Sequence, residues 1–215
     1  MLSEKDRHFM ERLKKTIIPK KHIVETRKNL INSFLKVQSL RIRHQLFEGG
    51  WTQSLIREVL LRPRAVGVLL YDPDCDCVVL VRQFRVGMID QAQNPWLLEI
   101  VAGLADEGEK IADVAVREVF EESGIKLEDH EIIADYFNSP GISDERTTIF
   151  CGQVDSKKAG GIFGVDSENE DICVEVLSLD DAFKFLISGE INNAMTIIAL
   201  QWLALNKKEL LVRWA

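Results

Sequence analysis

The sequence predicts an α/β fold in which helices pack on a mixed β-sheet, rather than a parallel Rossmann sheet. Two observations indicate this class. Strand-like apolar runs lie both before and after one strongly helical segment, and two more helices end the chain, so strands and helices do not alternate regularly. With 215 residues, 46% of them hydrophobic, the chain is long enough to bury a core without disulfides.

The first part of the chain is expected to hold an arm and a small β domain. Residues 1–33 are rich in lysine and show weak helical periodicity, which favours an arm or a docked helix. Two partly alternating runs, 34–47 and 51–61, flank the turn sequence Glu48-Gly49-Gly50 and predict a hairpin. The predicted division is an arm over 1–33, a small antiparallel β domain over 34–62 and a main domain over 63–215.

Within the main domain, six further strands are predicted where apolar runs are bounded by turn residues. They are Ala65–Tyr71, Cys77–Phe84, Leu97–Val101, Glu131–Phe137, Arg146–Val154 and Ile172–Ser178. The clearest helix spans Lys110–Ser123, with acidic residues near its start and Gly124 where a helix-ending glycine belongs. The two final helices are predicted over 179–188 and 193–214.

Charge and cysteine content exclude several classes of protein. A net charge of −7 argues against general nucleic-acid binding, which depends on clustered lysine and arginine. A phosphate-containing substrate would therefore need a bound cation or a few converging arginines.

The early residues do not resemble a signal peptide and no apolar run is long enough to span a bilayer, so we expect a cytoplasmic protein. The four cysteines lack zinc-site spacing and are expected to be free thiols: Cys75, Cys77, Cys151 and Cys173.

The strongest motif lies in and just before the predicted helix at 110–123. Gly103, Glu109 and the run 117–125 follow the spacing G-x5-E-x7-R-E-U-x-E-E-x-G-U without a deviation, where U is a bulky aliphatic residue. At about 3.6 residues per turn, Glu118 and Glu122 share one helix face and Glu121 flanks them. Their repulsion costs an isolated helix about 0.2–0.5 kcal/mol per pair, which a divalent cation removes. Hard carboxylate oxygens are the ligands that Mg²⁺ prefers.

The other side of this helix is apolar, so it is expected to pack on the sheet: Ala112, Ala115, Val116, Val119 and Phe120. Arg117 is expected to orient a glutamate through a charge-assisted hydrogen bond. Gly103 is expected to permit a strand-to-loop turn that exposes the carbonyl of Ala102. A solvated surface helix explains any one of these glutamates, but it does not explain the complete pattern.

A second acidic cluster follows the glycine-rich run 160–164. It is Glu168-Asn169-Glu170-Asp171. A loop carboxylate is a natural candidate for a general base, although such a sequence also occurs in ordinary polar turns.

The 103–125 pattern is the Nudix box, and the chain resembles the bacterial ADP-ribose diphosphatases (ADP-ribose pyrophosphatases) of the Nudix superfamily. The likeness runs from about Phe34 to Ala215 and assigns no role to residues 1–25. Besides the box and the acidic cluster, it rests on the strings at 96–103, 139–141 and 198–203. It implies an α/β/α Nudix sandwich with a mixed sheet, preceded by a small antiparallel β domain that is exchanged between the subunits of a homodimer.

The resemblance also implies the roles of individual residues. It implies two or three Mg²⁺ ions, with Mn²⁺ as a possible substitute, held by the carbonyl of Ala102 and by Glu118, Glu122 and Glu170. Glu168 matches the general base, and Glu121 is a further catalytic candidate. The implied substrate-binding residues are Phe34, Leu35, Arg57, Glu58, Arg62, Arg85, Leu104, Ser139, Pro140, Gly141 and Glu145. Each also has a structural interpretation: Phe34 and Leu104 as core residues, Arg57, Glu58 and Arg62 as exposed strand charges, Arg85 as a surface cation, and 139–141 as a turn.

The expected function is Mg²⁺-dependent hydrolysis of the diphosphate bond of ADP-ribose to AMP and ribose 5-phosphate. One alternative is a Nudix hydrolase acting on another nucleoside diphosphate compound, such as a nucleotide sugar, a dinucleoside polyphosphate or a reduced dinucleotide. The other is a sensor that binds ADP-ribose without hydrolysing it. Neither nucleic acid nor membrane is expected as a partner.

Overall fold

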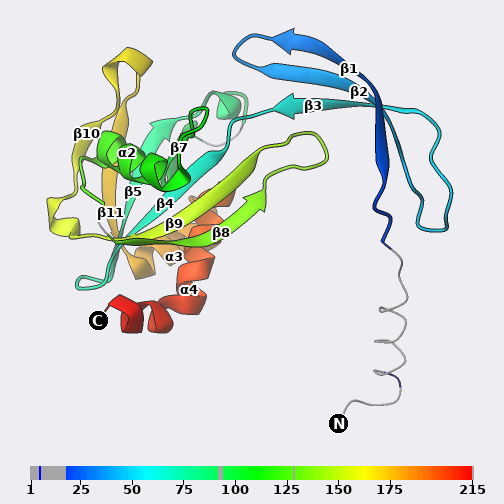
Figure 1. Cartoon of the computed structure of the whole chain (residues 1–215). Coiled ribbons are helices and arrows are strands. Elements are labelled where there is room, and N and C mark those ends of the chain that lie inside the picture. Colours follow the sequence, from blue (N-terminus) through cyan, green and yellow to red (C-terminus); the bar gives the residue numbers. More distant parts are fainter. Residues whose placement is uncertain (1–4, 6–17, 92–93, 128, 215) are drawn as a thin grey trace. The chain divides into compact units, whose positions relative to one another are not determined.

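The computed structural model describes residues 5, 18–91, 94–127 and 129–214 and divides into two compact units (Figure 1). The first unit comprises Met1–Arg62 and Ser139–Asp144, and the second comprises Pro63–Asn138 and Glu145–Ala215. The first unit thus combines the chain up to Arg62 with a short segment from the middle of the chain.

The first unit is a three-stranded antiparallel sheet in the order β1-β2-β3. Its strands are β1 His22–Asn32, β2 Lys36–His44 and β3 Leu55–Leu61. The predicted hairpin is confirmed by the antiparallel pairing of β2 with β3. The prediction of an arm or helix is wrong over 22–32, because β1 pairs with β2 along its whole length. Every residue of β1 is exposed, so it lacks the alternation of buried and exposed side chains that identifies a strand. Residues 1–4 and 6–17 of the predicted arm lie outside the described residues.

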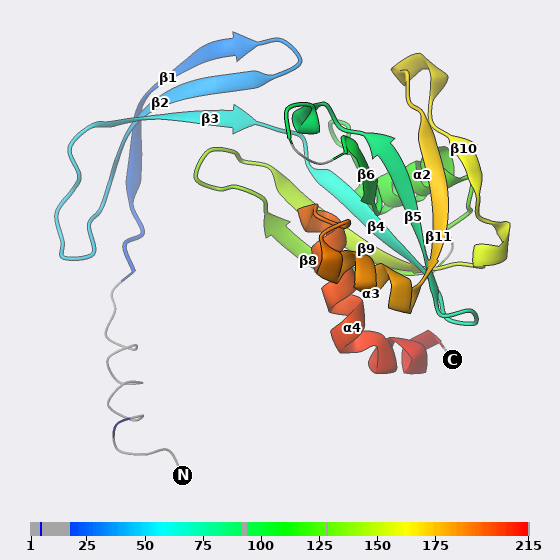
Figure 2. The same cartoon turned by 180° about the vertical axis from the view of Figure 1, so that it is seen from behind.

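The second unit is a mixed sheet with α2 on one face and α3 and α4 on the other (Figures 1 and 2). The sheet path is β10-β11-β5-β4-β9-β8, with β6 paired to β5, β7 paired to β4, and β4 parallel to β9. The expected α/β/α sandwich is therefore confirmed. The strands are β4 Ala65–Asp72, β5 Cys77–Phe84, β6 Trp96–Glu99, β7 Val101–Leu104, β8 His130–Phe137, β9 Arg146–Gln153, β10 Gly161–Phe163 and β11 Ile172–Ser178. The helices are α2 Ile111–Ser123, α3 Leu179–Ser188 and α4 Ala194–Trp214, with the short 3-10 helices η1 Val86–Met88, η2 Ser156–Lys158 and η3 Asp166–Glu168.

The predicted single strand at 97–101 is two strands. β6 pairs with the distal half of β5, and β7 pairs with the first half of β4, so the chain changes partner at Ile100. This change of partner brings Ala102 and Gly103 onto β7, beside the central strand. β10 escaped prediction because its glycine-rich sequence has low strand propensity.

The core lies on both faces of the central strand β4, every residue of which is buried. One apolar cluster lies under α2 and the other under α3 and α4. On α2, Ala115 and Val119 are buried as predicted, together with Val114. Val116 and Phe120 are instead 38% and 62% exposed, so their predicted packing on the sheet is wrong. The sheet covers a narrower stripe of the helix than the apolar sequence suggested.

All four cysteines are free, as predicted. Among the described helices, none is both long enough and apolar enough to cross a membrane.

Candidate active site

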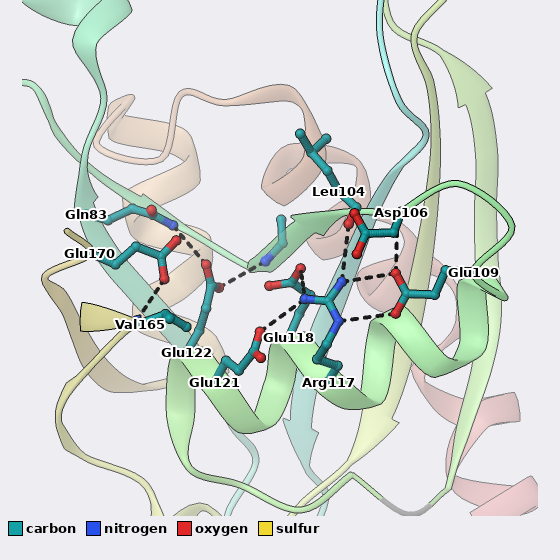
Figure 3. A network of polar contacts seen from close by, with 11 residues as sticks. Gln83, Leu104, Asp106, Glu109, Arg117, Glu118, Glu121, Glu122, Val165 and Glu170 are labelled. Carbon is teal, nitrogen blue, oxygen red and sulfur yellow. Dashed lines mark hydrogen bonds and ion pairs between the residues drawn. The ribbon is translucent and has the colours of Figure 1, made fainter. Parts of the chain in front are cut away.

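Arg117 is the centre of a polar network on α2 (Figure 3). Its Nη1 donates to Glu118 Oε1 at 2.8 Å and to Glu121 Oε2 at 3.1 Å. Its Nε and Nη2 each donate to Glu109 at 3.2 Å, and Nη2 also donates to the carbonyl of Leu104 at 3.2 Å. The predicted charge-assisted hydrogen bond from Arg117 to a glutamate is confirmed. The same guanidinium also ties the loop before the helix to the helix itself.

Glu122 is the most deeply buried carboxylate of the box, with 2% of its surface exposed. One oxygen accepts the backbone N–H of Ala102 at 3.1 Å, and the other accepts the side-chain amide of Gln83 at 3.4 Å. Burial, together with the negative charges of Glu118 and Glu170, raises the pKa of Glu122 to about 8. Burial also raises the pKa of Glu118, although Arg117 opposes that shift. These carboxylates are thus held in an environment that disfavours their charged form until a cation arrives.

Gly103 has a different role from the one predicted. It lies within β7, its φ is not in the left-handed region, and the strand continues to Leu104, so no turn depends on it. A Cβ at this position would instead overlap the carboxylate of Glu118. The glycine is required because β7 and the acidic face of α2 approach each other closely here.

The acidic loop is joined to α2 through Gly164. The N–H of Gly164 donates to the carbonyl of Glu121 at 3.3 Å, and its φ of 116° is one that L-residues rarely adopt. A Cβ on Gly164 would lie 2.7 Å from the Cβ of Glu170. The carboxylate of Glu170 in turn accepts the N–H of Val165 at 3.1 Å. Glu168 ends η3 with an exposed side chain that has no partner among the described residues.

The other predicted substrate residues are divided between the two units. In the second unit, Arg85 follows β5 and pairs with Glu99, Leu104 ends β7 and is 37% exposed, and Glu145 accepts a hydrogen bond from Asn138. Phe34 is 86% exposed, so its alternative interpretation as a core residue is wrong. Eight predicted residues belong to the first unit: Phe34, Leu35, Arg57, Glu58, Arg62, Ser139, Pro140 and Gly141.

The donor set has the chemistry of a divalent-cation site. Glu118, Glu122 and Glu170 supply hard oxygens, and the negative charge of Glu170 contributes to the raised pKa of both Glu118 and Glu122, a cost that a cation among them would offset. In the part of the chain that is described, however, no three His, Cys, Asp or Glu side chains already converge on one point. These residues therefore have the type of ligand atom that a divalent metal ion needs, and they lie near one another. In this structure their carboxylates accept hydrogen bonds from Arg117 and from backbone and amide N–H groups.

Two buried polar residues of this region were not among the predicted site residues. Gln83 and Glu99 are 7% and 8% exposed and lie on adjacent strands, β5 and β6. Gln83 donates to Glu122, and Glu99 accepts from Arg85. Each interrupts an apolar strand sequence, and a polar residue within a buried run is a signal that a partner must be present.

Comparison with known proteins agrees with this architecture. The NUDIX domain profile matches residues 61–196. The ADP-ribose pyrophosphatase of Escherichia coli (strain K12) is 41% identical over 189 residues, covering 88% of this chain and 90% of that protein. The ADP-ribose pyrophosphatase of Haemophilus influenzae (strain ATCC 51907 / DSM 11121 / KW20 / Rd) is 40% identical over 188 residues, covering 86% and 87%.

A solved structure described as an ADP compounds hydrolase superposes with a TM-score of 0.68 over 88% of this chain and 96% of that one. At 20% sequence identity, this match speaks for the fold alone. The complete box at residues 103–125, the sandwich that carries it and the match over residues 61–196 together show that the chain belongs to the Nudix family.

Proposed function

We propose that the protein hydrolyses the diphosphate bond of ADP-ribose, giving AMP and ribose 5-phosphate. The observation that carries the proposal is the pair Glu118 and Glu122 on α2, of which Glu122 is buried and the side chain of Glu118 is only 12% exposed, on a helix that packs against β7 and is bonded to the loop before the acidic cluster through Gly164. The names of the relatives that match nearly the whole chain support ADP-ribose as the substrate. A homologue that only senses ADP-ribose would not need to retain every glutamate of the box.

Nudix hydrolases generally use divalent metal ions, and we propose Mg²⁺, with two or three ions per site. The carbonyl of Ala102 and the carboxylates of Glu118, Glu122 and Glu170 would hold them. When bound, such ions lower the pKa of a coordinated water and neutralise charge on the diphosphate. Arg117 keeps Glu118 and Glu121 in place during the reaction.

The chain's own residues would then direct the attack of water. Glu168 accepts the proton of the water whose oxygen forms a bond to one phosphorus, and the bond from that phosphorus to the bridging oxygen breaks. Leu104 lines the site and Glu121 supports it. Glu145 and Ser139-Pro140-Gly141 are proposed to contact the terminal ribose.

Replacing Glu168 with glutamine is expected to lower kcat by about 100-fold or more, because a general base typically contributes 10²–10⁴-fold. Affinity for Mn²⁺, measured by electron paramagnetic resonance, should stay within about twofold of the wild type, since Glu168 is not a proposed metal ligand. Asp166→Asn in the same 3-10 helix is the matched control and should leave kcat unchanged. A Glu168→Gln protein with full kcat would show that another group accepts the proton.

We propose that the protein acts as a cytoplasmic homodimer in which the small β domains are exchanged. No described residue of the first unit is buried, although its sheet carries apolar side chains such as Ile23, Leu30 and Ile56. A sheet without a core of its own needs another surface to cover it. In this arrangement Phe34 and Leu35 would contact the adenine, joined by Arg57, Glu58 and Arg62 of the other subunit. Light scattering should give twice the 24.5 kDa of one chain.

The function is tested by assaying the purified protein against ADP-ribose, a nucleotide sugar, a dinucleoside polyphosphate and a reduced dinucleotide, with Mg²⁺ and then with a chelator. We expect Mg²⁺-dependent release of AMP, chiefly from ADP-ribose. Preference for another compound would keep the hydrolase and replace the substrate. Tight binding of ADP-ribose with no product from any compound would favour the sensor.

A further inference from the structure

Two arginine–glutamate ion pairs lie at the distal end of β5, one from Arg82 within the strand and one from Arg85 just after it. Arg82 Nε pairs with Glu175 of β11, and Arg85 Nε donates to Glu99 Oε2 of β6 at 2.6 Å. Gln83 and Arg85 are two residues apart, so their side chains leave the same side of the chain, and Arg82 leaves the opposite side. Because Gln83 donates to Glu122, the Arg85 pair lies on the face of the sheet that carries the acidic helix.

Two contacts fix Arg85, although it lies beyond the end of β5. Its backbone N–H donates to the carbonyl of Pro95 at 2.8 Å, so both the backbone and the side chain are tied to the segment that forms β6. Glu99 uses Nε and no other nitrogen of the guanidinium. Among the described residues, neither Nη group of Arg85 donates to a protein acceptor, and the side chain remains 40% exposed.

The guanidinium lies on the same face of the sheet as the acidic side of α2. Gln83, two residues before Arg85 and on the same side of the chain, donates to Glu122 at 3.4 Å, which places Arg85 near the proposed metal ligands. The carboxylate of Glu99 is 10% exposed, and a carboxylate so deeply buried is stable only with a cationic partner. Burial of Glu99 therefore holds the arginine beside the acidic face and leaves its two Nη groups available to an anion.

We propose that Glu99 is a positioning residue for substrate binding: it fixes Arg85 so that both Nη groups are presented to the diphosphate of the substrate. The inference rests on the proposed hydrolysis of a nucleoside diphosphate compound, but not on ADP-ribose in particular. A planar guanidinium held through Nε keeps its paired Nη groups free for two parallel hydrogen bonds to phosphate oxygens. Glu99 itself does not touch the substrate.

The test is a double-mutant cycle of Glu99→Gln, Arg85→Ala and the double variant, with kcat and KM measured for ADP-ribose in Mg²⁺. Each single variant is expected to raise KM about 10-fold and to change kcat less. The double variant should be no worse than Arg85→Ala alone, a coupling of about 1.4 kcal/mol for a tenfold effect. Glu175→Gln removes the equivalent ion pair on the other face and should leave kcat and KM within about twofold. Thermal unfolding of each variant checks that it is folded.

Two results would overturn the inference. One is an unchanged KM in folded Glu99→Gln. The other is an equal loss from Glu99→Gln whether or not Arg85 is present, which would indicate a structural role independent of the arginine. If another compound of the panel is the better substrate, the cycle is run on that compound, since every member contains the linked phosphates. Failure of ADP-ribose as the substrate and failure of the role of Glu99 are therefore separate outcomes.

Discussion

Replacing Glu122 with glutamine is expected to lower kcat by at least about 100-fold, or roughly 2.7 kcal/mol of transition-state stabilisation. Glutamine keeps the size of the side chain and can still accept the N–H of Ala102, but it cannot supply the charge that binds a cation. Affinity for Mn²⁺, measured by electron paramagnetic resonance, should fall together with kcat. Glu107→Gln, an exposed residue in the loop before α2, is the control and should leave both unchanged.

The same substitution is expected to stabilise the metal-free protein at alkaline pH. The folded-state pKa of Glu122, about 8, lies above its usual value of 4.5. The folded state therefore holds this proton more tightly than the unfolded state, and the stability from this group is lost as pH rises from 4.5 through 8. Each pKa unit is worth about 1.4 kcal/mol, so the free energy of unfolding of Glu122→Gln, in a chelator at pH 8, should exceed that of the wild type by roughly 4 kcal/mol.

Near pH 4.5 the wild type and Glu122→Gln should have the same stability, because the carboxyl group is then protonated in the folded wild type. Urea unfolding at the two pH values measures the difference. A variant with full kcat would remove Glu122 from the metal site. A variant that is less stable than the metal-free wild type at pH 8 would contradict the effect of burial on the carboxylate.

Gly103→Ala is expected to lower kcat by about 100-fold or more while the protein remains folded. The new Cβ occupies the position of the Glu118 carboxylate, which must move away and give up its hydrogen bond with Arg117. The backbone of β7 is compatible with alanine because the φ of Gly103 is not in the left-handed region. Because the substitution removes a metal ligand and not a contact of the core, the free energy of unfolding should change much less than the activation free energy that kcat reports.

The route through Glu118 can be checked directly. Gly103→Ala combined with Glu118→Ala should be no less active than Glu118→Ala alone, because the carboxylate is already lost. Gly87→Ala is the matched control, since a Cβ there meets nothing within 4 Å. Additive losses in the double variant would mean that Gly103 acts on something other than Glu118.

The sequence was most informative where a regular pattern and a chemical motif coincide. Helix α2 begins within a residue of its predicted start and ends at Ser123 as predicted, because the glycine that follows it and the box fix the same boundary. Most strands of the second unit were found because their faces differ in burial or because their apolar runs end in turn residues. Strand β1 offered neither signal, since every residue of it is exposed.

The predictions that failed at the site concern contacts between different strands and helices, which the pattern of a single element does not reveal. The glycine at 103 was expected to make a turn, but its absent Cβ accommodates Glu118 from an element 15 positions later in the chain. Gln83 reaches the site only when α2 packs on the sheet, and Glu99 reaches Arg85 only when β6 pairs with β5. Val116 and Phe120 look like core residues on a helical projection, but they are exposed because the sheet covers a narrower part of the helix.

The segment 139–144, which leaves the second unit and joins the first, limits how the protein can be cut into fragments. Its carbonyl at Ile142 accepts the N–H of Leu60, and the N–H of Asp144 donates to the carbonyl of Leu60, so the segment is bonded to β3. A chain cut to begin at residue 63 would leave both groups unpaired. At the base of this segment, the N–H of Asn138 donates to the carbonyl of Glu145, which already closes β8 against β9. A fragment that contains only the second unit should therefore be made by two cuts, with a short turn joining Asn138 to Glu145, rather than by a single truncation.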